Sequence, residues 1–205
     1  MKQNKKRGAK VKVIGVTGGV GSGKSVVLSI LEKDYHAETI LADLVAHDLM
    51  QPGGKSYEDI VEAFGDGILN DDGTIDRVKL GNIVFHDAEK LQKLNAITHP
   101  NVKEEIKNRI QKIREQGTAS MILLEAALLI ESGYEDVYDE LWYIYVDRET
   151  RYRRLQEGRG YTREKTDSIM QKQLTEEQFR KYADVVIDNS HSIEETKRQI
   201  RNICG

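Results

Sequence analysis

A chain of 205 residues, 39% of them apolar and 32% charged, has the composition of a soluble globular protein with one substantial core and room for smaller lobes. It contains no apolar stretch long enough to span a bilayer and no apolar-centred signal at its N-terminus, so we expect a cytoplasmic protein without a membrane partner. The net charge of −3 argues against a general nucleic-acid partner.

The chain opens with a basic leader, residues 1–10, which we expect to be disordered and to which we assign no function. From Val11 onward, apolar runs alternate with helical periodicity, the pattern of a parallel sheet covered by helices. Five apolar runs predict strands at 11–17, 39–42, 120–124, 141–146 and 184–189. We expect an α/β core formed by residues 11–43, 117–147 and 183–205.

A glycine-rich stretch follows the first predicted strand and precedes a predicted helix at 24–33. It matches G-x-x-x-x-G-K-[ST], the pattern of a phosphate-binding loop whose backbone amides surround an anion at a helix N-terminus. We expect Lys24 to contact the β- and γ-phosphates of a nucleotide and the Ser25 hydroxyl to bind Mg²⁺. An ordinary glycine-rich turn would not need this lysine and serine. The predicted nucleotide-binding residues are Gly18, Gly19, Val20, Gly21, Ser22, Gly23, Lys24, Ser25 and Val26.

The loop predicts the fold class: an α/β P-loop NTPase with a three-layer α/β/α core, a parallel sheet, a helical insertion and a helical lid. Ligands of such sheets lie beyond the carboxyl ends of the strands, and the second predicted strand ends at Asp43. Asp43 is therefore our candidate for orienting or deprotonating an attacking hydroxyl, with capping of the next helix as the alternative. Glu125, at the end of the third predicted strand, either holds a Mg²⁺-bound water or simply ends its strand.

Residues 44–116 are dominated by helical patterns and predict an insertion that binds a phosphoryl acceptor or, as the alternative, a structural decoration. We expect helices at 56–64 and 77–85 and a longer one from Ala88, interrupted at His99-Pro100 because proline removes a backbone donor.

Residues 148–182 carry a cluster of arginines and predict a lid. A solvated helix face explains most of them, but helices around Gly158-Arg159-Gly160 follow a strand that leads to the nucleotide site, where a closing lid would carry phosphate-binding arginines. The cluster comprises Arg148, Arg151, Arg153, Arg154, Arg159 and Arg163.

A phosphate loop alone does not separate a kinase from a switch or a motor. The chain is too short for a large motor domain and contains no N-K-x-D run of the kind that guanine-specific switches use. A helical insertion and an arginine-bearing lid favour an enzyme that brings two small substrates together and excludes water. A nucleotide-responsive binding module that signals through its insertion is the alternative from another class.

The order and spacing of the motifs closely resemble those of the dephospho-coenzyme A kinase family over nearly the whole chain. The resemblance implies that ATP phosphorylates the ribose 3′-hydroxyl of dephospho-CoA, giving CoA and ADP in the last step of coenzyme A synthesis. It also implies a nucleotide core, a CoA-binding region at 44–116 and a lid at 148–182. The motifs are the phosphate loop, Ala42-Asp43, Pro52-Gly53-Gly54, Phe64-Gly65, Asp72-Gly73, Asp76-Arg77, Leu80, His99-Pro100, residues 128–131, Gln173 and residues 183–189.

The resemblance assigns catalytic roles to Lys24, Asp43 and Arg159. Asp43 matches the second aspartate of the family's Asp-Ala-Asp motif, the proposed base, whereas Leu41 replaces the first aspartate. The usual Arg-Asp pair of the lid reads Gly158-Arg159, so the lid arginine is displaced by one position.

Arg77 and His99 fit the pattern of the acceptor side, although a histidine before a proline is also a common helix-breaking residue. A nucleoside or nucleoside monophosphate kinase is the nearest alternative, because it would use the same loop and lid on another acceptor. The sequence carries no signal of oligomeric state.

Overall fold

The computed structural model describes residues 10–126 and 128–205, so the predicted leader lies outside the described residues except for Lys10. The chain divides into two compact units. The first comprises the chain up to Thr39 together with Ile110–Gly205, and the second comprises Ile40–Arg109. Each unit is described by itself below.

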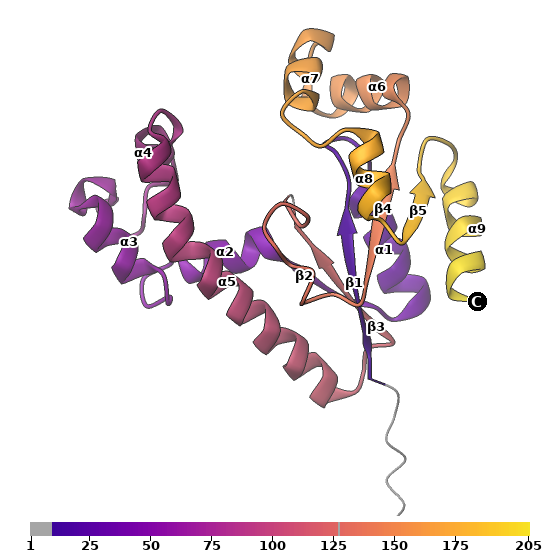
Figure 1. Cartoon of the computed structure of the whole chain (residues 1–205), viewed down its shortest axis with the longest axis horizontal. Coiled ribbons are helices and arrows are strands. Elements are labelled where there is room, and N and C mark those ends of the chain that lie inside the picture. The colour runs from indigo at the N-terminus through magenta and orange to yellow at the C-terminus, as the bar shows by residue number, and fades with distance from the viewer. Residues whose placement is uncertain (1–9, 127) are drawn as a thin grey trace, which may run out of the picture. The chain divides into compact units, whose positions relative to one another are not determined.

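Five strands form one sheet with the order β2-β3-β1-β4-β5 (Figure 1). The central strand β1 pairs in parallel with β3 and β4, and β4 pairs in parallel with β5. Residues 13–17 of β1 are all buried, as expected for a strand covered on both faces. The predicted strands are confirmed to within one residue at each end: β1 (Lys12–Thr17), β2 (Glu38–Leu41), β3 (Met121–Glu125), β4 (Glu140–Tyr145) and β5 (Val185–Asp188).

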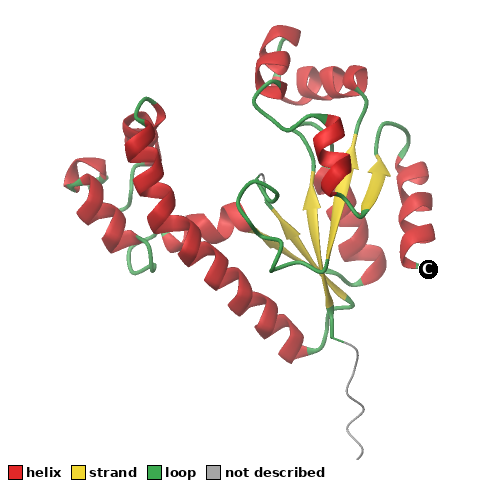
Figure 2. Cartoon of the chain, viewed as in Figure 1, coloured by secondary structure: helices red, strands yellow, loops and turns green. Residues whose placement is uncertain are grey.

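Helices lie on both sides of this sheet (Figure 2). Leu31 of α1 is completely buried, and Phe179 of α8 stacks on Tyr143 of β4 with ring centroids 4.7 Å apart. Four helices of this unit begin after a capping side chain that accepts a hydrogen bond from a backbone amide of the first turn. The capping residues are Asp147, Thr162, Thr175 and Ser192. The helices of the first unit are α1 (Lys24–Tyr35), α6 (Arg148–Arg159), α7 (Arg163–Met170), α8 (Glu176–Tyr182) and α9 (Ile193–Cys204).

The second unit is helical and has a core of its own. Its elements are α2 (Ala42–Leu49), α3 (Tyr57–Phe64), the 3₁₀ turn η1 (Asp66–Ile68), α4 (Arg77–Phe85) and most of α5 (Ala88–Gln116). Buried aliphatic side chains from α3, η1 and α4 form that core: Ile60, Ile68, Ile75, Leu80 and Val84. A separate apolar cluster is what a segment needs to hold its own fold.

The prediction that a helix is interrupted at His99-Pro100 is wrong, because α5 continues through Pro100. Side chains next to the proline bond to backbone carbonyls of this turn: Thr98 Oγ1 donates to Leu94 O at 3.0 Å and Asn101 Nδ2 to Ile97 O at 3.1 Å. The buried Ile106, after the proline, anchors the helix in the protein interior. Leu94 and Ile97, before the proline, pack against the core of the second unit, so burial on both sides of Pro100 opposes the cost of about 3 kcal/mol that proline imposes on a helix interior.

None of the helices in the described ranges combines the length and the apolar character that a membrane crossing requires. The longest, α5, has 29 residues and is rich in charged side chains.

Ile60→Ala tests the core of the second unit. The Ile60 side chain is fully buried, so its truncation should lower the free energy of unfolding by about 2–5 kcal/mol. Val78→Ala is the matched control, because Val78 is 72% exposed and its truncation should change stability by less than about 0.5 kcal/mol. Urea denaturation followed by circular dichroism measures both, and equal effects would contradict the assignment of this core.

Candidate active site

The loop between β1 and α1 has a backbone that only glycine can supply at two positions. Gly18 has φ 152°, and a Cβ atom there would lie 2.6 Å from the Ile144 carbonyl oxygen of β4. Gly23 has φ 83°, and a Cβ atom there would lie 2.3 Å from Asn189 Nδ2. The loop therefore packs directly on its neighbours, a geometry that suits a phosphate cradle of backbone amides.

A buried polar network holds this loop from behind. Asn189, which follows β5 and is 2% exposed, donates from Nδ2 to Ser22 O at 2.8 Å. Its Oδ1 accepts a hydrogen bond from Thr196 Oγ1 of α9 at 3.0 Å. Arg154 of α6 donates to Asn189 O at 2.8 Å and to Ser22 O at 3.4 Å, and burial lowers the pKa of its guanidinium. Residues from the C-terminal part of the chain thus hold a loop that lies near the N-terminus.

Lys24 lies where the sequence predicts a phosphate ligand. Its Nζ donates to Gly18 O at 2.9 Å and lies 3.4 Å from Glu125 Oε1, with both side chains less than 20% exposed. The register explains the pairing with Glu125, because β3 aligns Glu125 with Val16, next to the start of the loop. These two contacts fix the ammonium group beside Gly18, at the start of the loop.

Oxygen donors suited to Mg²⁺ occur at this end of the sheet. Ser25 is exposed in the first turn of α1, and the Glu125 carboxylate is directed to the same loop by its pairing with Lys24. Mg²⁺ takes one or two protein oxygen ligands together with water and substrate phosphates, so this small donor set fits the ion. Residues 10–126 and 128–205 contain no group of three or more His, Cys, Asp or Glu side chains that could hold a metal without such phosphates.

The arginines of α6 and α7 fall into different environments. Arg148 pairs with Asp167 at 2.6 Å, and Arg163 pairs with Glu149 at 2.6 Å, so these arginines tie α6 to α7. Hydrogen bonds from Tyr152 and Arg148 lower the pKa of Asp167. Arg159 is exposed at the last residue of α6, with its guanidinium 6.0 Å from the centroid of the Tyr161 ring. Its predicted contact with ATP stays a prediction.

Gln173 and Arg151 also contact the loop, although the sequence analysis gave neither of them an individual role. Gln173 Oε1 accepts a hydrogen bond from Val20 N at 3.2 Å, and the side chain of Arg151 lies against the loop glycines. Gln173 stands among the family motifs, and that is the one sequence signal that pointed to it. Arg151 is one of six arginines in a charged stretch, and no pattern there marks it out.

The remaining predicted residues belong to the second unit. Asp43 is not the tip of a strand, because β2 ends at Leu41 and Asp43 is the second residue of α2. It does not cap that helix either, since the cap is Leu41 and no side chain bonds to the helix start. The Asp43 side chain is exposed, as are Arg77 at the start of α4 and His99 within α5.

Comparison with known families decides between the kinase classes. The family model described as dephospho-CoA kinase matches residues 12–195, which include the phosphate loop, the whole second unit and most of the first. The chain belongs to the dephospho-CoA kinase family. It is therefore a transferase that uses ATP to phosphorylate dephospho-CoA in coenzyme A synthesis, as the sequence motifs imply.

Relatives in this family match nearly end to end. The dephospho-CoA kinase of Carboxydothermus hydrogenoformans is 44% identical over 191 residues, covering 93% of this chain and 92% of that protein. The dephospho-CoA kinase of Geobacter sulfurreducens is 42% identical over 191 residues, covering 93% and 96%.

Solved structures confirm the P-loop kinase fold. The protein TT1252 of Thermus thermophilus superposes with a TM-score of 0.80 at 28% identity, covering 96% of this chain and 97% of that one. The dephospho-CoA kinase of Campylobacter jejuni has a TM-score of 0.70 at 26% identity, with 94% of both chains covered. A shikimate kinase of Acinetobacter baumannii, at 14% identity and a TM-score of 0.52, shares the fold alone.

Asn189→Ala tests the network behind the loop. It leaves Ser22 O without its shortest bond and removes the acceptor of Thr196 Oγ1, so the free energy of unfolding should fall by about 1–3 kcal/mol. ATP affinity, measured by calorimetry, should fall as well, because the loop loses the hydrogen bond from Asn189 that holds Ser22 in place. Asn202→Ala, at an exposed position of α9, is the control and should change neither quantity appreciably. Wild-type affinity in Asn189→Ala would contradict the bracing role.

Proposed function

We propose that the γ-phosphoryl group of ATP is transferred to the ribose 3′-hydroxyl of dephospho-CoA by the residues assembled around the phosphate loop. The observation that carries this proposal is the position of Lys24, held by Gly18 O and Glu125 at the start of the loop, in a chain matched by the family over residues 12–195. Phosphoryl transfer depends mainly on positioning and on neutralising charge, and this arrangement provides for both.

The loop amides and Lys24 bind the phosphates of ATP in this proposal. Two interactions hold the lysine side chain in place, so little conformational freedom is lost when it meets an anion. Ser25 would hold Mg²⁺, with Glu125 bonded to one of its waters. The ion supplies electrostatic stabilisation of the charge on the transferred group.

The acceptor side belongs to the second unit in this proposal. Asp43 orients the attacking hydroxyl and accepts its proton, while Arg77 and His99 contact dephospho-CoA. Asp43 is suited to the role because its carboxylate is exposed and is not engaged in capping α2. The domain boundaries of the sequence analysis are part of the proposal: 44–116 binds the acceptor and 148–182 closes as a lid that carries Arg159.

Acceptor dependence tests the function. Purified protein with ATP and Mg²⁺ should release ADP rapidly with dephospho-CoA and slowly with nucleosides, nucleoside monophosphates or no acceptor. ADP release that is equally fast without an acceptor would contradict the kinase reaction. Faster turnover on a nucleoside monophosphate than on dephospho-CoA would favour the nearest alternative instead.

Asp43→Asn tests the role of this carboxylate. Loss of the base should lower kcat by about 10²- to 10⁴-fold and leave ATP affinity unchanged. Asp48→Asn, on the same helix, is the matched control: Asp48 is exposed and pairs with Arg109, so kcat should stay near wild type. Steady-state ADP release and ATP calorimetry separate the two quantities. Weaker ATP binding with unchanged kcat in Asp43→Asn would point to the metal side of the site.

A further inference from the structure

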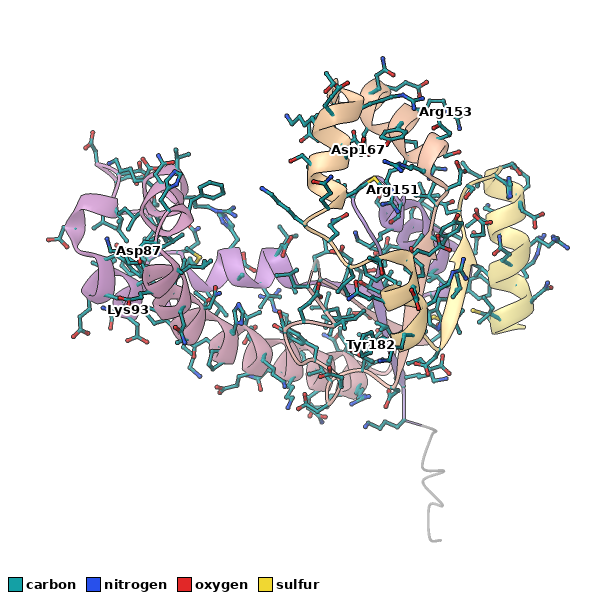
Figure 3. The ribbon with its side chains drawn as sticks, turned by 45° about the horizontal axis from the view of Figure 1, so that its top comes forward. Asp87, Lys93, Arg151, Arg153, Asp167 and Tyr182 are labelled. Carbon is teal, nitrogen blue, oxygen red and sulfur yellow. The ribbon has the colours of Figure 1, made fainter. Side chains whose placement is uncertain are left out.

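Arg151 is placed at the phosphate loop by the topology of the sheet. β4 pairs in parallel with β1 and aligns Tyr143 with Thr17, so α6, which follows β4, begins on the same edge as the loop that follows β1. Arg151 lies in the first turn of α6. Figure 3 shows Arg151 on the side of α6 that faces the sheet and Arg153 on the opposite side.

The Arg151 side chain lies directly on the loop. A Cβ atom on Gly21 would lie 3.2 Å from Arg151 Cγ, and a Cβ atom on Gly19 would lie 3.1 Å from Arg151 Nη1. The aliphatic stem therefore covers Gly21 while the guanidinium reaches Gly19. Absence of side chains at these two glycines is what permits the approach.

Within the described residues, the Arg151 guanidinium has no counter-ion, unlike those of Arg148 and Arg163. Arg148 and Arg163 form ion pairs across the lid helices, and Arg154 donates to loop carbonyls. In residues 10–126 and 128–205, Arg151 forms no ion pair, and its Nε is buried without a hydrogen-bond partner. A buried donor without a partner costs free energy that an incoming anion would recover.

An oxygen acceptor already occupies the space beside it. Gln173 Oε1 takes the hydrogen bond of Val20 N at 3.2 Å and lies 3.0 Å from the Cβ position of Gly19, where Arg151 also approaches. The loop amide and the guanidinium thus point to one small region. A phosphate oxygen suits this region better than a neutral amide oxygen, because both groups form stronger hydrogen bonds with a negatively charged acceptor.

We propose that Arg151 is a phosphate-binding residue of the ATP site, with its guanidinium contacting a triphosphate oxygen at the Gly19 end of the loop. The inference rests on the proposed function for the identity of the nucleotide. It gives the lid an arginine from the first turn of α6 in addition to the predicted Arg159, which is exposed at the opposite end of that helix.

Arg151→Met and Arg151→Lys test the proposal as a pair. Methionine keeps much of the stem that packs on Gly21 and removes the charge, whereas lysine keeps stem and charge but loses the planar fork. ATP titration by calorimetry should give a Kd about 10- to 100-fold weaker for Arg151→Met than for wild type, with Arg151→Lys between them. Adenosine, which has no phosphate, should bind the three proteins equally. Arg153→Gln, exposed on the other side of α6, is the control and should keep wild-type affinity.

Equal ATP affinity in Arg151→Met and Arg151→Lys would overturn the proposal, because charge would then have no role. A loss of ATP affinity in Arg159→Gln with wild-type affinity in Arg151→Met would also overturn it. The ligand-free thermal midpoint should be the same in both Arg151 variants, and an ATP loss that follows a fall in that midpoint would indicate packing alone. Calorimetry needs no acceptor, so a wild-type protein that binds ATP but fails to phosphorylate dephospho-CoA would refute the proposed function and leave this test intact.

Discussion

A loop that directs its amide groups toward an anion has to direct carbonyl groups elsewhere, and those carbonyls need donors. In this protein the donors come from distant elements. Ser22 O accepts hydrogen bonds from the side chains of Asn189 and Arg154, and Gly18 O accepts one from the Lys24 ammonium group. The anion-binding conformation is therefore maintained by α1, α6 and the segment after β5 together, and each residue that braces the loop also fixes the position of its own element.

Much of this architecture could be predicted because its signals are local. Apolar runs bounded by turn residues locate all five strands to within one residue, and G-x-x-x-x-G-K-[ST] locates the loop without any tertiary knowledge. The start of α4 at Arg77 also has a local signal, because the Asp76 side chain caps the helix by accepting hydrogen bonds from Val78 N and Lys79 N. Such signals need only neighbouring residues to be interpreted.

The rest depends on contacts that the sequence does not display. Proline at position 100 is a local reason to end a helix, but α5 continues through it because side chains before and after the proline are packed in the interior. Arg151 looks like its five arginine neighbours, and its position against Gly19 and Gly21 emerges only from the pairing of β4 with β1. The apolar run at 39–42 predicts a strand end at Asp43, but α2 begins directly after Leu41, without an ordinary capping residue to mark its start.

The bond between Asn189 and Ser22 spans 167 positions of the sequence. During synthesis the phosphate loop leaves the ribosome long before Asn189 and Thr196 exist, so its carbonyls remain hydrated while most of the chain is being made. Bringing together two residues that are so far apart in the sequence also costs conformational entropy. This cost arises only late, when the second residue has been made. A nascent chain extending only to β4 would carry the complete loop sequence, yet it would lack the groups that give the loop its shape. Nucleotide binding should thus mature as one of the last events of folding.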